Sequence, residues 1–282
     1  MLNIDQHVHT NASPDGRAPI EAIVASAKAK GLTHLALTDH YESMPADPQF
    51  FVHDNNKGWF AAAQDRYHTV MRDAWENGER AKQLAGEDLT VVIGIELGSP
   101  LDDLPRTEEI LAAHDYGFIL ASQHNNTARP DFYYLQHFPE LDLLVELDRY
   151  FDALYEIVQW GKFHSLAHLT YPFRYIPSDR MPADTRRWDE QINAILRLLA
   201  EKGLALEVNT AGLRKGLGVT SPDLTIVRRF KQLGGELITI GSDAHLAEDV
   251  GADLEQGAAL CREAGFRYVA RYVDGKPILT AI

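Results

Sequence analysis

Short apolar segments alternate with longer amphipathic segments along most of the chain. Segments such as 32–38 and 89–95 are almost continuously hydrophobic, which is typical of strands buried on both faces. Segments such as 19–30 carry apolar residues at helical spacing and end at a glycine. This pattern predicts strands at 2–9, 32–38, 89–95, 118–122, 164–168, 204–208, 236–240 and 266–272. It predicts helices at 19–30, 59–84, 107–114, 141–161, 184–202, 222–233 and 248–264.

Strand and helix alternate throughout, and no segment of linker-like composition interrupts them. Such alternation indicates an α/β fold with a parallel sheet covered by helices, and this many units favour closure into a (β/α) barrel. We expect a single domain over residues 1–282. A doubly wound open sheet is the alternative, although no glycine-rich phosphate loop follows the first strand. Two long irregular loops are expected at 41–57 and 125–140.

The composition excludes several classes of partner. With 27 Lys and Arg against 41 Asp and Glu, the formal net charge is -14, so we expect no nucleic-acid partner, which would require a basic surface. No long uncharged apolar stretch occurs, so we expect no membrane segment. The single cysteine, Cys261, excludes an intramolecular disulfide and fits a reducing compartment, which favours a cytoplasmic location. These features leave the oligomeric state open.

His7 and His9 are the first candidates for chemistry. Alternate side chains of an extended strand share a face, so the two imidazoles point the same way. Two neutral imidazoles side by side can hold one metal ion. Asp243 and His245 repeat this spacing directly after the strand predicted at 236–240.

Further metal-binding residue types occupy the same kind of position elsewhere in the chain. Each lies at or just past the C-terminal end of a predicted strand, namely His40, Glu96, His124 and His168. In a barrel those strand ends converge on one face, where active sites form. We therefore predict that these four residues form one metal site together with the pair His7 and His9 and the pair Asp243 and His245. The remaining histidines are interpreted as surface or ordinary core residues: His34, His53, His68, His114, His137 and His164.

The order of these motifs resembles the PHP (polymerase and histidinol phosphatase) superfamily. The matching motifs are His7-x-His9, Thr38-Asp39-His40, a strand ending in Glu96, the later His124 and His168, and Ser242-Asp243-x-His245. The chain length and the segment 209–214 most resemble the stand-alone histidinol-phosphate phosphatases. The resemblance implies a distorted (β/α)7 barrel and a cluster of two or three divalent metal ions, such as Zn, Mn or Fe.

The resemblance also implies which residues hold each ion. It assigns His7, His9, Glu96 and Asp243 to a first ion. It assigns Glu96, His124 and His168 to a second ion, with Glu96 bridging. It assigns Asp15, His40 and His245 to a third. Asp15 lies in the turn 13–16, so a turn-forming aspartate is an equal alternative at that position.

The chemistry of such a centre favours a phosphomonoester. Closely spaced divalent ions lower the pKa of a bridging water and can supply hydroxide near neutral pH. Three ions bring about six positive charges and three carboxylates remove about three, which leaves room for a dianionic substrate. With this chemistry, the resemblance implies a metal-dependent phosphomonoesterase that hydrolyses L-histidinol phosphate to L-histidinol and phosphate in histidine biosynthesis, by attack of a metal-bridging hydroxide.

Positive groups near the strand ends are expected because the acidic protein repels a dianion at long range. Arg174 and Arg214 both follow predicted strands, and a guanidinium can bind phosphate through two hydrogen bonds, so we expect both to bind the substrate phosphate. Asp243 and His245 are candidates to assist proton transfer to the leaving alkoxide, a role for which a metal ligand is seldom free. The loop tyrosines are candidates for the pocket wall: Tyr41, Tyr133, Tyr171 and Tyr175.

Other functions fit parts of the same pattern. A PHP hydrolase of another phosphoester, such as a nucleotide, an oligonucleotide end or phosphotyrosine, is the main alternative. This alternative stays open because segment 122–126 lacks the apolar residue that histidinol phosphatases are expected to have after the histidine. The loops at 41–57 and 125–140 also depart from the family's pattern. A metal-binding barrel without catalysis fits less well, since the ligand set is complete. An amidohydrolase would normally carry a strand-end lysine as the bridging ligand, where this chain has Glu96.

Overall fold

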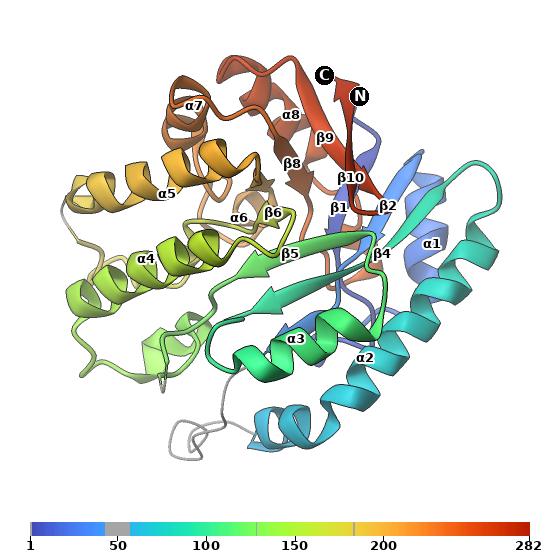
Figure 1. Ribbon diagram of the computed structural model, residues 1–282, viewed down its shortest axis with the longest axis horizontal. Helices are drawn as coiled ribbons and strands as arrows, with labels where there is room; N and C mark the ends of the chain where they lie inside the picture. The colour runs from blue at the N-terminus through green and yellow to red at the C-terminus, as the bar shows by residue number, and fades with distance from the viewer. Residues whose placement is uncertain (1, 43–56, 128, 183) are drawn as a thin grey trace.

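Parallel strands form a nearly closed barrel at the centre of the molecule (Figure 1). The computed structural model describes residues 2–42, 57–127, 129–182 and 184–282. The barrel strands follow one another in chain order: β1 (Ile4–Val8), β2 (His34–Leu37), β4 (Thr90–Gly98), β5 (Phe118–Ser122), β6 (Ser165–Leu166), β7 (Ala205–Asn209) and β8 (Ile238–Gly241). A short strand, β3 (His40–Glu42), also pairs with β4. This architecture confirms the predicted parallel α/β barrel.

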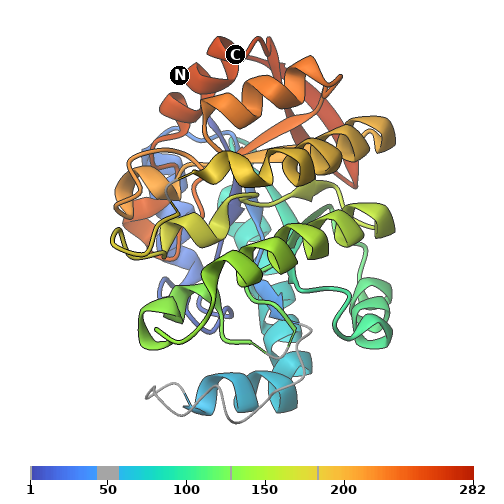
Figure 2. The ribbon, with the colours of Figure 1, turned by 90° about the vertical axis from the view of Figure 1, so that its left-hand side faces the viewer.

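Helices cover the outside of the barrel. They are α1 (Ile20–Ala29), α2 (Lys57–Ala85), α3 (Leu104–Ala113), α4 (Leu143–Trp160), α5 (Asp189–Lys202), α7 (Leu224–Gln232) and α8 (Leu254–Glu263), with a single turn α6 (Ala211–Arg214) after β7. Figure 2 shows α4 and α5 side by side on this outer layer. None of the helices in the described ranges is long and apolar enough to cross a membrane.

Helix α4 illustrates how the sequence determines these elements. The Asp142 side chain accepts hydrogen bonds from the first backbone amides of the helix, and Gly161 ends the helix in the left-handed conformation with φ 74°. Between these caps, Leu147, Phe151 and Leu154 recur at helical spacing and are fully buried. Burial of each such side chain stabilises the fold by roughly 1.5–3 kcal/mol relative to exposure.

The barrel closes where the end of β8 meets the end of β1. The Asp243 amide donates to the His7 carbonyl at 2.7 Å, and the His9 amide donates to the Ala244 carbonyl at 2.9 Å. At Gly241 the two strands approach so closely that an added Cβ would collide with Cβ of His7. A glycine is therefore required at this position, and the closure brings the ends of the first and last barrel strands together.

Strand β4 is longer than expected. The prediction ended this strand at residue 95 and placed Glu96 beyond it, whereas β4 continues to Gly98. The extension is stabilised on both sides, because Glu96 is in register with His40 of β3 and with Leu120 of β5. The backbone at Glu96 therefore pairs with a neighbouring strand on each side, which fixes the position from which its side chain projects.

The last predicted strand is one arm of a hairpin. The segment 266–272 corresponds to β9 (Tyr268–Val273), which pairs antiparallel with β10 (Lys276–Ala281). Asp274 and Gly275 connect them with φ of 48° and 71°, the conformation that an Asp-Gly hairpin turn requires. Ala270 and Tyr272 pack among residues at the amino-terminal ends of the barrel strands, so β9 closes the end of the barrel opposite the predicted site.

Several helix bounds also differ from the prediction. Helix α3 begins at Leu104 rather than at 107, because Asp103 caps it and accepts from the Arg106 amide. The helix predicted at 184–202 divides into the 3-10 turn Thr185–Trp188 and α5. Other short 3-10 turns are Phe132–His137, Tyr171–Arg174 and Ala247–Asp249. Most of the loop predicted at 41–57, including His53, lies outside the described residues.

Candidate metal centre

The carboxylate of Glu96 lies at the middle of a cluster of imidazoles. Its Oε2 atom is 3.0 Å from Nε2 of His7 and 3.5 Å from Nε2 of His9. Its Oε1 atom is 2.9 Å from Nε2 of His168 and 3.2 Å from Nε2 of His124. The two oxygens of one buried carboxylate thus face two different pairs of histidines, from the β1 end on one side and from the β5 and β6 ends on the other. Oε2 is also 3.1 Å from Nδ1 of His40.

A second group of ligand-type side chains lies beside this pair. Oδ1 of Asp243 is 3.6 Å from Nε2 of His9, and the His9 ring stacks between His40 and His245, with centroid distances of 4.1 and 4.2 Å. Oδ2 of Asp15 is 2.9 Å from Nε2 of His245 and 3.8 Å from Nε2 of His40. The nine side chains predicted as ligands therefore form one contiguous cluster at the carboxyl ends of the strands.

The donor atoms converge as metal ligands do. Four sets of three side chains have ligand atoms within 4.8 Å of one another: His9, His40 and His245; His7, His9 and Asp243; His7, Glu96 and His168; His40, Glu96 and His124. The Nε2 atom of His9 is fully buried and has no hydrogen-bond partner within the described ranges, which is costly unless something binds it. Imidazole and carboxylate donors in this arrangement fit divalent ions such as Zn, Mn or Fe.

Outer carboxylates hold the imidazoles in place. Oε1 of Glu207 in β7 is 2.6 Å from Nδ1 of His7, while its Oε2 accepts the His168 amide at 2.8 Å. Oε1 of Glu42 is 2.7 Å from Nδ1 of His124. Such contacts orient the ring and raise the basicity of the nitrogen that faces the ion. Sequence reasoning missed both glutamates, although Glu207 interrupts an apolar strand and is a signal for a buried polar role.

The ionisable groups of the cluster shift one another's pKa. Burial alone would raise the pKa of Glu96, but the charges of His40, His7 and His124 outweigh it and hold the pKa well below its usual range. Burial and the neighbouring His40 and His245 hold the pKa of His9 well below its usual value. Near neutral pH, Glu96 is therefore ionised and His9 is neutral, which are the forms that ligate metal.

The Asp243 loop adopts an unusual backbone conformation. Asp243 has φ of 55°, in the left-handed region that a residue with a side chain seldom occupies. Arg214 holds this loop, because its Nη2 atom donates to the carbonyls of Ser242 and Asp243 at 2.6 and 3.1 Å. Its Nε atom is 3.3 Å from Oδ2 of Asp249. Strained backbone held by tight contacts is characteristic of functional sites.

These contacts change the interpretation of the two predicted phosphate arginines. Arg214 is directed at the Asp243 loop and does not line the pocket beside the cluster, and its expected phosphate contact stays a prediction. Arg174 does line the pocket, with Nη1 bound to Asp243 Oδ2 and Nη2 bound to Asn209 Oδ1, both at 3.1 Å. Arg17 and Lys215, which the sequence did not single out, also line it.

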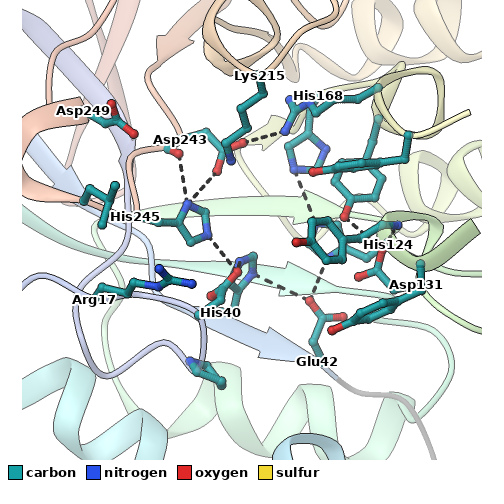
Figure 3. Close-up of a pocket in the computed structure, with 18 residues that line it drawn as sticks. Arg17, His40, Glu42, His124, Asp131, His168, Lys215, Asp243, His245 and Asp249 are labelled. Carbon is teal, nitrogen blue, oxygen red and sulfur yellow. Dashed lines mark hydrogen bonds and ion pairs between the residues drawn. The ribbon is translucent and has the colours of Figure 1, made fainter. Parts of the chain in front are cut away.

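The pocket has a volume of about 600 Å³ and opens directly onto the imidazoles (Figure 3). Tyr133, Tyr171 and Tyr175 line it as expected, and Asp131 and Tyr134 from the loop at 125–140 join them. Tyr41 does not reach the pocket, because its ring packs in the core against α2 and α3. The other described histidines lie outside the lining: His34, His68, His114, His137 and His164.

Known proteins resemble this chain over nearly its whole length. A family model described as PHP domain matches residues 5–211. The chain is 31% identical over 278 residues to a protein named "Probable histidinol-phosphatase" from Thermotoga maritima, with 98% of each chain covered. It is 25% identical over 278 residues to the histidinol-phosphatase of Lactococcus lactis, covering 96% of this chain and 95% of that protein.

A solved structure has the same fold. The crystal structure of histidinol phosphate phosphatase from Lactococcus lactis, complexed with zinc, L-histidinol and phosphate, matches with a TM-score of 0.74 at 24% identity. The match covers 99% of this chain and 100% of that one.

Proposed function

Since the chain belongs to the PHP domain family, we propose that it is a metal-dependent phosphomonoesterase that hydrolyses L-histidinol phosphate. The observation that carries this proposal is the position of Glu96 between two pairs of imidazoles, of which His124 and His168 line the pocket. Histidinol-phosphatase is also the name of full-length relatives. The proposed ligands are His7, His9, Asp15, His40, Glu96, His124, His168, Asp243 and His245.

Bound divalent ions would supply activated water near neutral pH and stabilise charge on the leaving oxygen. The chain's own residues would position the ester and control protons. Burial lowers the pKa of His245, but Asp15 at 2.9 Å raises it above its usual value overall. Burial would raise the pKa of Asp243, but Lys215 and His9 hold it well below its usual range. Both residues are also proposed ligands, and a group bound to an ion is seldom free to give a proton, so we propose that the ions carry most of the stabilisation of the leaving alkoxide.

Arg17 and Lys215 are the proposed phosphate-binding cations of the pocket. Both are exposed and line it, and neither forms an ion pair in the part of the chain that the structure describes. Arg174 carries positive charge at the same wall, but both of its terminal nitrogens are bound to Asp243 and Asn209. A cation without an internal partner can bind a dianion without breaking an existing contact.

Replacement of Lys215 by methionine is expected to raise KM for phosphomonoesters by about tenfold with little change in protein stability, because one charged contact to phosphate is lost. Steady-state kinetics and thermal unfolding would measure this. The matched control is Lys276→Met, on exposed β10 outside the pocket. An unchanged KM in Lys215→Met would remove this lysine from the phosphate site.

The substrate can be tested with a panel of phosphomonoesters on metal-loaded protein. We expect kcat/KM for L-histidinol phosphate to exceed that for p-nitrophenyl phosphate, a nucleoside monophosphate and phosphotyrosine. A different preferred ester would retain the phosphatase and overturn the substrate. Turnover of none of them by protein with full metal content would favour a metal-binding barrel without catalysis. The cytoplasmic location and the absence of a nucleic-acid partner stay predictions from composition.

A further inference from the structure

We infer that Asp131 and the tyrosines around it form a subsite for an ammonium group on the alcohol part of the substrate. The inference rests on the proposed phosphomonoesterase function, because it assigns the opposite end of the same pocket. It concerns the part of the ester that the metal centre does not contact. The subsite would select esters that carry a positive charge close to the phosphate.

Asp131 has an oxygen available for a ligand. Its Oδ1 atom accepts the Tyr133 amide at 2.7 Å and the Tyr171 hydroxyl at 2.9 Å, which fixes the carboxylate in place. Its Oδ2 atom has no hydrogen bond or ion pair among the residues that the structure describes, and Asp131 lines the pocket. Burial raises the pKa of Asp131 to about 6, although the nearby His124 lowers it. A cation bound at Oδ2 would stabilise the ionised carboxylate.

The tyrosines connect this carboxylate to the metal centre. The Tyr171 ring lies with its centroid 4.8 Å from that of His124 and 5.0 Å from that of His168, and its hydroxyl reaches Asp131. Tyr175 packs 5.0 Å from Tyr171 on the same wall. One phenol ring therefore spans the distance between the predicted ligands and Asp131. Aromatic faces next to a carboxylate suit an organic ammonium, which is attracted by both.

The two cations of the pocket that have no ion pair among the described residues lie away from Asp131. In Figure 3, Asp131 lies at the right of the imidazole cluster, while Arg17 lies at the left and Lys215 at the top. The acids on the cation side are paired, Asp249 with Arg214 and Asp15 with His245. Arg174 approaches the rings of Tyr171 and Tyr175, but its guanidinium is bound to Asp243 and Asn209. This polarity matches an ester with phosphate at one end and an ammonium a few bonds away. L-histidinol phosphate has that charge arrangement, and so does any 2-aminoalkyl phosphate.

Binding of two matched phosphonates tests the subsite without requiring turnover. 3-Aminopropylphosphonate has the length of a 2-aminoethyl phosphate, with a methylene in place of the ester oxygen. Butylphosphonate differs from it by a methyl group in place of the ammonium. We expect calorimetry on the metal-loaded protein to give at least about tenfold tighter binding of the amine, the size expected for a charged hydrogen bond in a shielded pocket. In Asp131→Asn this preference should fall to about one, with butylphosphonate affinity unchanged.

The asparagine variant keeps the acceptor oxygen that the Tyr133 amide and Tyr171 hydroxyl require, so it should fold normally. Glu140→Gln, an exposed position in the same loop, is the matched control and should retain the preference. Equal binding of the two phosphonates by the wild type, or an unchanged preference in Asp131→Asn, would overturn the subsite. Failure of the phosphatase proposal would appear separately, as absence of turnover in protein that still binds both compounds.

Discussion

Replacement of Glu96 by glutamine is expected to lower kcat/KM by at least about a hundredfold and to reduce the number of bound divalent ions. This effect is larger than that of removing a residue that only hydrogen-bonds to a metal ligand. Glutamine has nearly the same shape, but it loses the negative charge that faces two pairs of imidazoles. Its amide nitrogen would also point at one pair, because only one oxygen remains. Kinetics together with metal analysis of the purified variant would measure both losses.

The control for this substitution is Glu156→Gln on the exposed side of α4, which removes the same charge far from the pocket. This control should keep the metal content and the turnover of the wild type. A Glu96→Gln variant with full metal content and normal turnover would contradict the bridging role. Loss of turnover with full metal content would place Glu96 in the chemistry but not in ion binding.

Removal of the divalent ions by a chelator is expected to abolish turnover and to lower Tm by at least about 5 °C. Without ions, the ligand nitrogens and oxygens remain buried and lose the charge that offsets their desolvation. Only protonated histidines would then offset the negative charge of Glu96. The imidazoles lie close enough together for their positive charges to repel one another. Calorimetry before and after chelation would measure the shift. Addition of Zn or Mn in excess should restore both Tm and turnover, which separates ion loss from damage by the chelator.

An unchanged Tm after complete ion removal, verified by metal analysis, would show that the cluster is stable without ions. Full turnover by ion-free protein would contradict the metal-dependent mechanism itself. The two readouts report different properties: Tm reports the stability that the ions add, and turnover reports their part in catalysis.

The predicted ligand set could be found in the sequence because strand ends are visible as changes from apolar to polar residues. More than 100 residues separate His7 from His124 and His124 from Asp243, yet barrel geometry alone brings the strand ends together. The structure places these side chains in one cluster, and their role in ion binding stays a prediction. The hairpin of β9 and β10 also had a signal, since Asp274-Gly275 is the commonest type of tight hairpin sequence.

Other features could not be found because they depend on the direction of long side chains. Arg214 follows a strand as Arg174 does, but its guanidinium turns toward backbone carbonyls rather than into the pocket. Glu42 of β3 reaches His124, which follows β5, across the end of β4, a contact between residues 82 positions apart. Tyr41 sits one residue after His40 and points to the other face of its strand, into the core. Side-chain direction in these cases follows from packing, which periodicity does not encode.

The meeting of β1 and β8 has a consequence for the order of events in synthesis. His7 emerges from the ribosome early, whereas Asp243 and His245 emerge 236 residues or more later, and Gly241 must dock against His7 before their loop is in place. A nascent chain that has reached only β7 has seven of the nine proposed ligand side chains, and it lacks the wall that closes around them. Such a long loop closure is slow relative to local helix formation. The complete coordination shell therefore comes into existence as one of the last steps of folding, after the rest of the barrel has already been translated.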